Sequence, residues 1–183
     1  MEGTTIEQVV IPRWLRGVDI LVGTISIALC VLVLIGFVPS NVAILVLVTL
    51  SLFMVGLARF ARAAAVTAKG TARRAINLVA GCIGIAAASL LMFNIELPEE
   101  QLLVLLAVAW MIMGFARISI GVIEKDVSLW VRILQVVVGF ATIALTSVVV
   151  LFSAADFSAF VLFLLIVVMA NGLARTSRGY VGV

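Results

Sequence analysis

A four-residue motif that ends in arginine occurs three times in the chain, at an interval of 58 residues. It reads Gly-Leu-Ala-Arg at 56–59, Gly-Phe-Ala-Arg at 114–117 and Gly-Leu-Ala-Arg at 172–175. The same interval separates Arg16, Arg74 and Arg132, and it also separates Gly23, Gly81 and Gly139. Three triplets in one register, without an insertion, indicate tandem copies of one structural unit. We therefore expect an N-terminal tail over residues 1–9, followed by three repeats at 10–67, 68–125 and 126–183.

Each repeat contains two long apolar segments. Hydrophobic residues make up 65% of the chain and charged residues only 11%, whereas soluble domains are about half apolar and about a quarter charged. Segments of about 20 apolar residues can cross a hydrocarbon core of about 30 Å as helices, and lipid excludes open sheets. The sequence predicts an all-α polytopic membrane protein with six transmembrane helices, arranged as three tandem 58-residue hairpins around a pseudo-threefold axis. The helices are expected at 14–38, 41–66, 72–95, 98–122, 127–152 and 157–177, with Gly179 as the last C-terminal stop.

The charges alternate between the two ends of these segments. All 12 Lys and Arg residues lie near the chain termini, in the second and fourth connections, or in the adjoining helix turns. The other three turns hold no Lys or Arg, and their charged residues are Glu96, Glu99, Glu100 and Asp156. By the positive-inside rule we expect a cytoplasmic (inner) membrane protein with both termini in the cytoplasm. Because the charges sit only at the ends of apolar segments, the expected partners are membrane lipids, including anionic ones, and not nucleic acid.

Six arginines occupy two repeat positions at one depth. They are Arg16, Arg74 and Arg132 at the start of each first helix, and Arg59, Arg117 and Arg175 near the end of each second helix. In one interpretation they are snorkelling anchors that fix orientation. In the other they form a basic ring that binds an anion or acidic lipid headgroups. If they converged on the axis, the cluster would need anionic compensation, and the neutral Asn77 and Gln135 stand where the first repeat has Asp19.

Asp19 follows Arg16 by three residues, which places both side chains on one face of a helix. An unpaired carboxylate inside the membrane is costly. We therefore expect a local ion pair between Arg16 and Asp19.

Small residues recur early in the first helix of each repeat. Gly23, Gly81 and Gly139 lie about two turns into these helices, and Gly84 extends the pattern in the second repeat. Small residues in a stripe let helix backbones approach closely. We expect these glycines to make helix contacts around the pseudo-axis. The alternative, a narrow pore lined by glycine backbone, lacks the ring of polar side chains that a filter usually has.

Sequence signatures of catalysis are missing. The chain has no histidine, and we find no metal-ligand spacing, nucleophile elbow, phosphate-binding loop or dinucleotide fingerprint. No ionisable residue is expected near a bilayer centre, which argues against a proton-coupled pump. We predict no enzyme activity, no catalytic residue, no metal and no cofactor.

Three hairpins in a chain of 183 residues resemble the HdeD-like acid-resistance membrane proteins, which are built on a short repeat of unknown function. The similar features are the early glycines, the proline-bearing turns at Pro39 and Pro98, and a glycine before the basic end of each second helix (Gly56, Gly114 and Gly172). The third repeat departs from this pattern, with Asp156 at the position of Pro98. The resemblance implies a six-span inner-membrane protein with a structural or stress-tolerance role, and it implies no catalytic residue. The alternatives are an accessory subunit of a larger membrane complex and a small channel or transporter; a homo-oligomer is a further possible arrangement.

Overall fold

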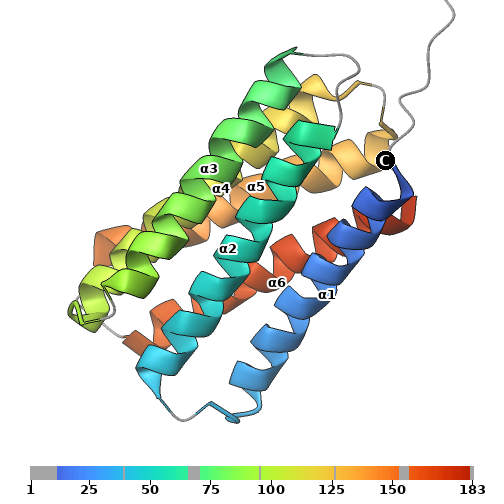
Figure 1. Ribbon diagram of the computed structural model, residues 1–183. Helices are drawn as coiled ribbons and strands as arrows, with labels where there is room; N and C mark the ends of the chain where they lie inside the picture. The colour runs from blue at the N-terminus through green and yellow to red at the C-terminus, as the bar shows by residue number, and fades with distance from the viewer. Residues whose placement is uncertain are drawn as a thin grey trace, which may run out of the picture.

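Six α-helices make up most of the part of the chain that the structure describes. A computed structural model describes residues 12–38, 40–65, 71–94, 96–125, 127–152 and 157–181. The helices are α1 (Arg13–Leu34), α2 (Asn41–Ala65), α3 (Thr71–Phe93), α4 (Glu99–Ile123), α5 (Leu129–Phe152) and α6 (Phe157–Val181). All six are long and apolar enough to cross a membrane (Figure 1). The predicted fold class is confirmed, and the chain is a multi-pass integral membrane protein. The predicted tail at 1–9, together with Pro39 and Asp156 of the predicted turns, lies outside the described residues.

The three hairpins point in the same direction. The starts of α1, α3 and α5 and the ends of α2, α4 and α6 all lie at one end of the bundle (Figure 1). We call this the basic end, because the arginines lie toward it. The opposite, acidic end carries Glu96, Glu99 and Glu100. Which end faces the cytoplasm stays a prediction from the charge distribution.

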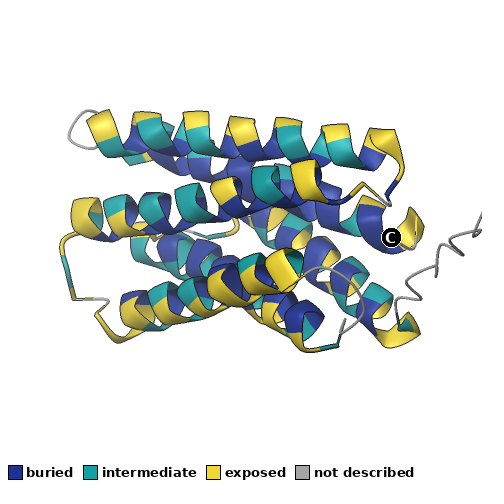
Figure 2. Ribbon diagram, turned by 90° about the horizontal axis from the view of Figure 1, so that it is seen from above, coloured by how far each residue is buried: buried dark blue, intermediate teal, exposed yellow. Residues whose placement is uncertain are grey.

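The even-numbered helices form the inside of the bundle. In their most apolar stretches α2, α4 and α6 bury 44–56% of residues, whereas α1, α3 and α5 bury 28–33%, and the buried faces point inward (Figure 2). The most extensive contacts join α2 to α3, α4 to α5 and α6 to α1. Each inner helix thus packs on the outer helix of the following repeat, and the third repeat closes on the first. This cyclic pattern, together with contacts among α2, α4 and α6, gives the bundle its pseudo-threefold symmetry.

Pairs of glycines lie at these three inter-repeat contacts. A Cβ atom on Gly81 would lie 3.0 Å from the carbonyl oxygen of Gly56, and one on Gly139 would lie 3.0 Å from that of Gly114. In the third pair, a Cβ atom on Gly23 would lie 2.7 Å from the carbonyl oxygen of Gly172. The glycines therefore permit close helix crossings. They lie between inner and outer helices, however, and not around the axis as predicted.

The fourth glycine of the predicted packing set, Gly84, faces a different neighbour. A Cβ atom there would meet the terminal methyl group of Met113 and would lie 3.3 Å from the Cα of Gly56. Gly84 thus brings α3 close to both α2 and α4.

Two helix ends differ from the prediction. α1 ends at Leu34 and not at residue 38, because Gly36 adopts a left-handed φ of +73°. The amide of Phe37 then donates to the carbonyl of Leu32 at 3.2 Å, which is the bond of a Schellman C-cap. α6 continues through Gly179 to Val181. Gly179 is therefore not a helix stop.

Gly179 instead serves a helix contact. A Cβ atom on Gly179 would lie 3.1 Å from the carbonyl oxygen of Arg16 in α1. Gly121, at the equivalent repeat position in α4, makes the same approach to Arg132 of α5. At both positions a side chain would be crowded against the backbone of the neighbouring helix.

Repeat-equivalent apolar side chains fill the space between the inner helices. Three successive layers are fully or almost fully buried and belong to one core cluster. From the acidic end they are Leu45, Leu103 and Val161; Val48, Leu106 and Leu164; and Leu52, Trp110 and Val168. One turn further toward the basic end, Val55, Met113 and Asn171 are buried at the next equivalent position. The centre of the bundle is therefore packed over most of its length.

Candidate functional site

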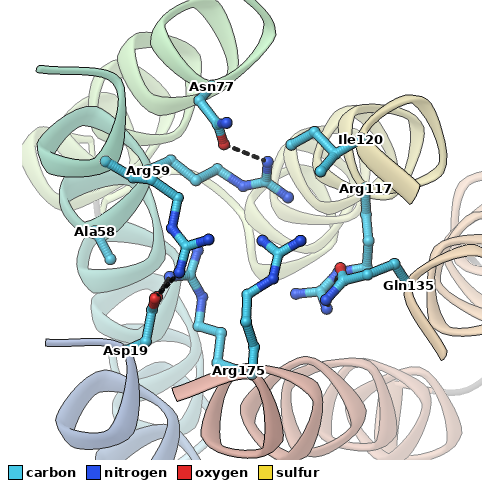
Figure 3. Close-up of a pocket in the computed structure, with 10 residues that line it drawn as sticks. Asp19, Ala58, Arg59, Asn77, Arg117, Ile120, Gln135 and Arg175 are labelled. Atoms are coloured by element: carbon cyan, nitrogen blue, oxygen red, sulfur yellow. Dashed lines mark hydrogen bonds and ion pairs between the residues drawn. The ribbon is translucent and has the colours of Figure 1, made fainter. Parts of the chain in front are cut away.

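A small, partly open pocket, which we call the chamber, lies between the helices toward the basic end (Figure 3). Apart from Ala58, its lining consists of three sets of residues at equivalent positions in the three repeats. The sets are Arg59, Arg117 and Arg175; Arg62, Ile120 and Arg178; and Asp19, Asn77 and Gln135. Because every repeat contributes all three positions, the chamber lies on the pseudo-threefold axis.

The first set comes from the inner helices. Arg59, Arg117 and Arg175 each lie six residues before the last residue of their helix, a depth of about 9 Å at a rise of about 1.5 Å per residue. Their exposed fractions are only 5%, 2% and 7%, and their guanidinium groups point into the same space (Figure 3). These three arginines therefore converge in the interior of the bundle. Snorkelling anchors would instead point outward to lipid headgroups.

Each of these arginines donates a hydrogen bond to the equivalent residue of the following repeat. Arg59 donates to Oδ1 of Asn77 at 3.5 Å and Arg117 to Oε1 of Gln135 at 3.2 Å. Arg175 donates to Oδ1 of Asp19 at 2.9 Å, which closes the ring. Asn77, Gln135 and Asp19 come from the outer helices α3, α5 and α1. Inner and outer helices are thus tied by one polar contact per repeat.

The expected ion pair between Arg16 and Asp19 is wrong. Asp19 pairs instead with Arg175 and Arg62, which reach it from α6 and α2. Asp19 is 2% exposed, whereas Arg16 is half-buried and does not line the chamber. A buried carboxylate is offset only by well-placed donors, and the two interior guanidinium groups supply these.

The other three predicted arginines lie outside the chamber. Arg74 is exposed, while Arg16 and Arg132 are half-buried. The Nε of Arg132 donates to the carbonyl of Gly121 at 3.2 Å, at the end of α4. The six arginines of the sequence pattern therefore divide into an inner set of three and an outer set of three, and anchoring remains the interpretation of the outer set.

Arg62 and Arg178 belong to the chamber but were not predicted as site residues. Each follows an inner arginine by three residues, so each lies one turn closer to the basic end. Arg178 pairs with Glu124 at 2.6 Å, and Glu124 also pairs with Arg73 of α3 at 2.7 Å. The spacing of three in the sequence was the signal that could have identified Arg62 and Arg178.

Positive charge in the chamber exceeds negative charge. Five guanidinium groups and the single carboxylate of Asp19 leave the lining residues with a net charge of +4. At the edge, the carboxylate of Glu124 is shared between Arg178 of the chamber and Arg73 outside it. The C-terminal ends of the three inner helices offset this by about −0.5 each at most. A large part of the positive charge is therefore left without a counter-charge in the described part of the chain.

The same five arginines have unused hydrogen-bond donors. Two inner arginines each donate one hydrogen bond to a backbone carbonyl. Arg59 donates to that of Met113 at 3.4 Å, and Arg175 donates to that of Val55 at 3.1 Å. Seven buried nitrogens have no hydrogen-bond partner among the described residues; two lie outside the chamber, on Arg16 and Trp110, and the other five are one on each chamber arginine. They are Nε of Arg59, Arg117, Arg175 and Arg178, and Nη1 of Arg62. A buried donor without a partner costs free energy, so these nitrogens indicate a missing acceptor.

The chamber is small and closed on one side. The space open to the centre of a water-sized sphere is about 20 Å³, and about 10–15 Å³ holds one water molecule. Toward the acidic end the chamber stops at Val55, Met113 and Asn171, behind which the apolar layers begin. Among the described residues, no group of three Cys, Asp or Glu side chains could hold a metal ion. The chamber has the size and the donors for one small anion.

Comparisons of the chain with protein-family models, with curated proteins and with solved structures found no match. The resemblance to the HdeD-like proteins therefore stays a prediction. The chemistry of the chamber follows from the geometry of its own residues.

Proposed function

We propose that this membrane protein is not an enzyme, and that it binds one small anion in the arginine chamber at its basic end. The observation that supports this is the set of five buried guanidinium groups around one carboxylate. Like charges in a partly dehydrated site repel one another strongly, and an uncompensated buried charge costs several kcal/mol. A bound anion would offset both costs and would accept bonds from the five unpartnered nitrogens.

The shape of the chamber favours binding over conduction. A channel needs a continuous polar path, whereas the three layers behind the chamber consist of buried apolar side chains, including Leu52, Trp110 and Val168. Catalysis is not supported either, because the carboxylate of Asp19 is held by two guanidinium groups. Such a carboxylate is a poor general base.

We place this binding within the structural or stress-related role that the HdeD-like resemblance implies. The inner helices α2, α4 and α6 each contribute arginines to the chamber. An anion between these side chains would hold the three helices together at the basic end. Occupancy would therefore stabilise the bundle.

Thermal unfolding of the purified protein in a neutral detergent tests this proposal. Unfolding is measured in a buffer of low ionic strength, with and without millimolar anions. We expect the midpoint to rise with anion for the wild type and for Arg74→Gln, which removes an exposed charge outside the chamber. We expect no rise for Arg117→Gln, which removes an inner arginine. An anion at 100 times its Kd would stabilise the folded state by about 2.7 kcal/mol. Equal responses of all three proteins would contradict the proposal.

A further inference from the structure

We infer that the anion is a tetrahedral oxyanion with two negative charges, a phosphate-type dianion, and that it sits beside Arg59 and Arg117. This inference rests on the proposed function, because it names the ligand of the same chamber. Three features of the chamber carry it: the amount of uncompensated charge, the shape of the donors, and the position of Asp19.

The amount of charge matches a dianion better than a monoanion. The lining residues carry +4, and the three inner helix ends offset at most about −1.5 of this. With Glu124 shared between Arg178 and Arg73 at the edge and outside this count, about +2.5 is left, which a halide would reduce by only one unit. An oxyanion with two charges brings the chamber close to neutrality.

The donors suit an anion with several oxygens. A guanidinium group presents N–H groups in a planar fork that matches pairs of oxygens on carboxylate or phosphate. Here guanidinium groups from α2, α4 and α6 surround the same space. A tetrahedral oxyanion can accept from several of them at once through separate oxygens, whereas a halide offers one centre. The free space of about 20 Å³ holds one or two water-sized particles. A tetrahedral oxyanion would therefore push the guanidinium side chains apart, and a ligand with a bulky organic part is excluded from the chamber.

The position of the ligand follows from the asymmetry of the lining. Asp19 occupies the side between Arg62 and Arg175, where its carboxylate would repel an anion. On the other side Arg59 and Arg117 meet only amide oxygens, at 3.5 Å and 3.2 Å. The dianion therefore sits against α2 and α4, away from Asp19.

Two sources could supply this chemistry. Inorganic phosphate or sulfate could enter whole from the basic end. Alternatively, the terminal phosphate of a phosphomonoester lipid could enter while its glycerol and acyl chains stay outside. Both place the same group against Arg59 and Arg117.

The test is isothermal titration calorimetry of the protein in nanodiscs, with sulfate, phosphate or chloride at constant ionic strength. One set of nanodiscs contains only neutral lipid and a second set contains phosphatidic acid. Native mass spectrometry reports retained phosphatidic acid against phosphatidylglycerol, which is a phosphodiester. In neutral nanodiscs a free dianion source predicts 1:1 binding of sulfate and phosphate at least about tenfold tighter than chloride. A lipid source predicts selective retention of phosphatidic acid and its displacement by phosphate.

Arg117→Lys is the informative variant, since it keeps the charge and loses the fork. We expect it to keep binding chloride and to lose the preference for the oxyanions. Arg74→Gln serves as the control and should bind as the wild type does. Chloride binding as tight as sulfate binding in the wild type would overturn the oxyanion assignment while leaving anion binding intact. No binding of any anion, together with no retained acidic lipid, would overturn the proposed function itself.

Discussion

At the residue scale, the arginines near the basic end are found in two environments, one exposed and one buried. Arg74 is exposed and Arg117 is 2% exposed, although both mark the basic end of a helix. The difference lies in the helices that carry them. Arg117 is on the inner helix α4 and lines the chamber, whereas Arg74 is in the first turn of the outer helix α3 and lies outside it.

Asp19 gives the first prediction at this scale. Asp19→Asn removes the one carboxylate of the chamber lining and leaves Arg62 and Arg175 without their ion pairs. Breaking a buried pair from one side costs about 3–5 kcal/mol, so we expect a lower unfolding midpoint in anion-free buffer. Added anion should then raise the midpoint of this variant more than that of the wild type, because the carboxylate of Asp19 no longer competes with the anion for the guanidinium groups. Glu100→Gln, at an exposed acid, is the control. The idea fails if Asp19→Asn unfolds like the control.

At the element scale, the bundle is held by inner helices that cross outer helices of the next repeat at glycine pairs. The backbones approach so closely there that a side chain has no room: a Cβ atom on Gly81 would lie 2.8 Å from the backbone nitrogen of Phe60. Backbone cannot move aside as a flexible side chain can. The closure of α6 on α1 repeats this contact and completes the ring.

We expect Gly81→Leu to separate α2 from α3. Overpacking of this kind costs about 1–3 kcal/mol. The control is Val79→Leu in the same helix, at a side chain that is 54% exposed. Thermal unfolding in detergent compares the two. Similar midpoints would show that the Gly81 contact does not limit packing.

The helices were largely predictable and the chamber was not. Long apolar segments with a 58-residue period fix the number and direction of the helices, since lipid leaves few alternatives. Rotation of each helix about its own axis is set by tertiary packing, and this decided that Arg59 faces the interior. The partner of Asp19 was missed for the same reason, because Arg62 and Arg175 are distant in sequence. The end of α1 was misplaced because the left-handed turn at Gly36 was not recognised.

At the scale of the whole molecule, all three hairpins have the same orientation, which places basic and acidic connections at opposite ends (Figure 1). A bundle of this kind presents its chamber to one side of the membrane only. The positive-inside rule predicts that this side is the cytoplasm, so the ligand would be a cytoplasmic anion or a lipid of the inner leaflet.

Reporter fusions test this orientation. We expect a reporter fused at Val183 to signal from the cytoplasm and one inserted at Glu99 to signal from the outside, because positively charged connections are retained inside. The reverse result would place the chamber on the outer face.

The packed centre predicts that the protein does not conduct. In liposomes that contain the purified protein, we expect release of entrapped sulfate or chloride to match that of protein-free liposomes. The reason is the buried layer of Leu52, Trp110 and Val168 behind the chamber. Release that rises with protein content and falls in Arg117→Gln would identify a channel or transporter instead.

The most direct test of anion binding in the chamber is the anomalous signal of selenate in crystals of the protein. Selenate is a tetrahedral dianion with a heavy atom at its centre. We predict one selenium peak inside the chamber, nearer to Arg59 and Arg117 than to Asp19, with the guanidinium groups facing it. A chamber without selenium, or with Arg59, Arg117 and Arg175 turned outward to lipid, would contradict the account.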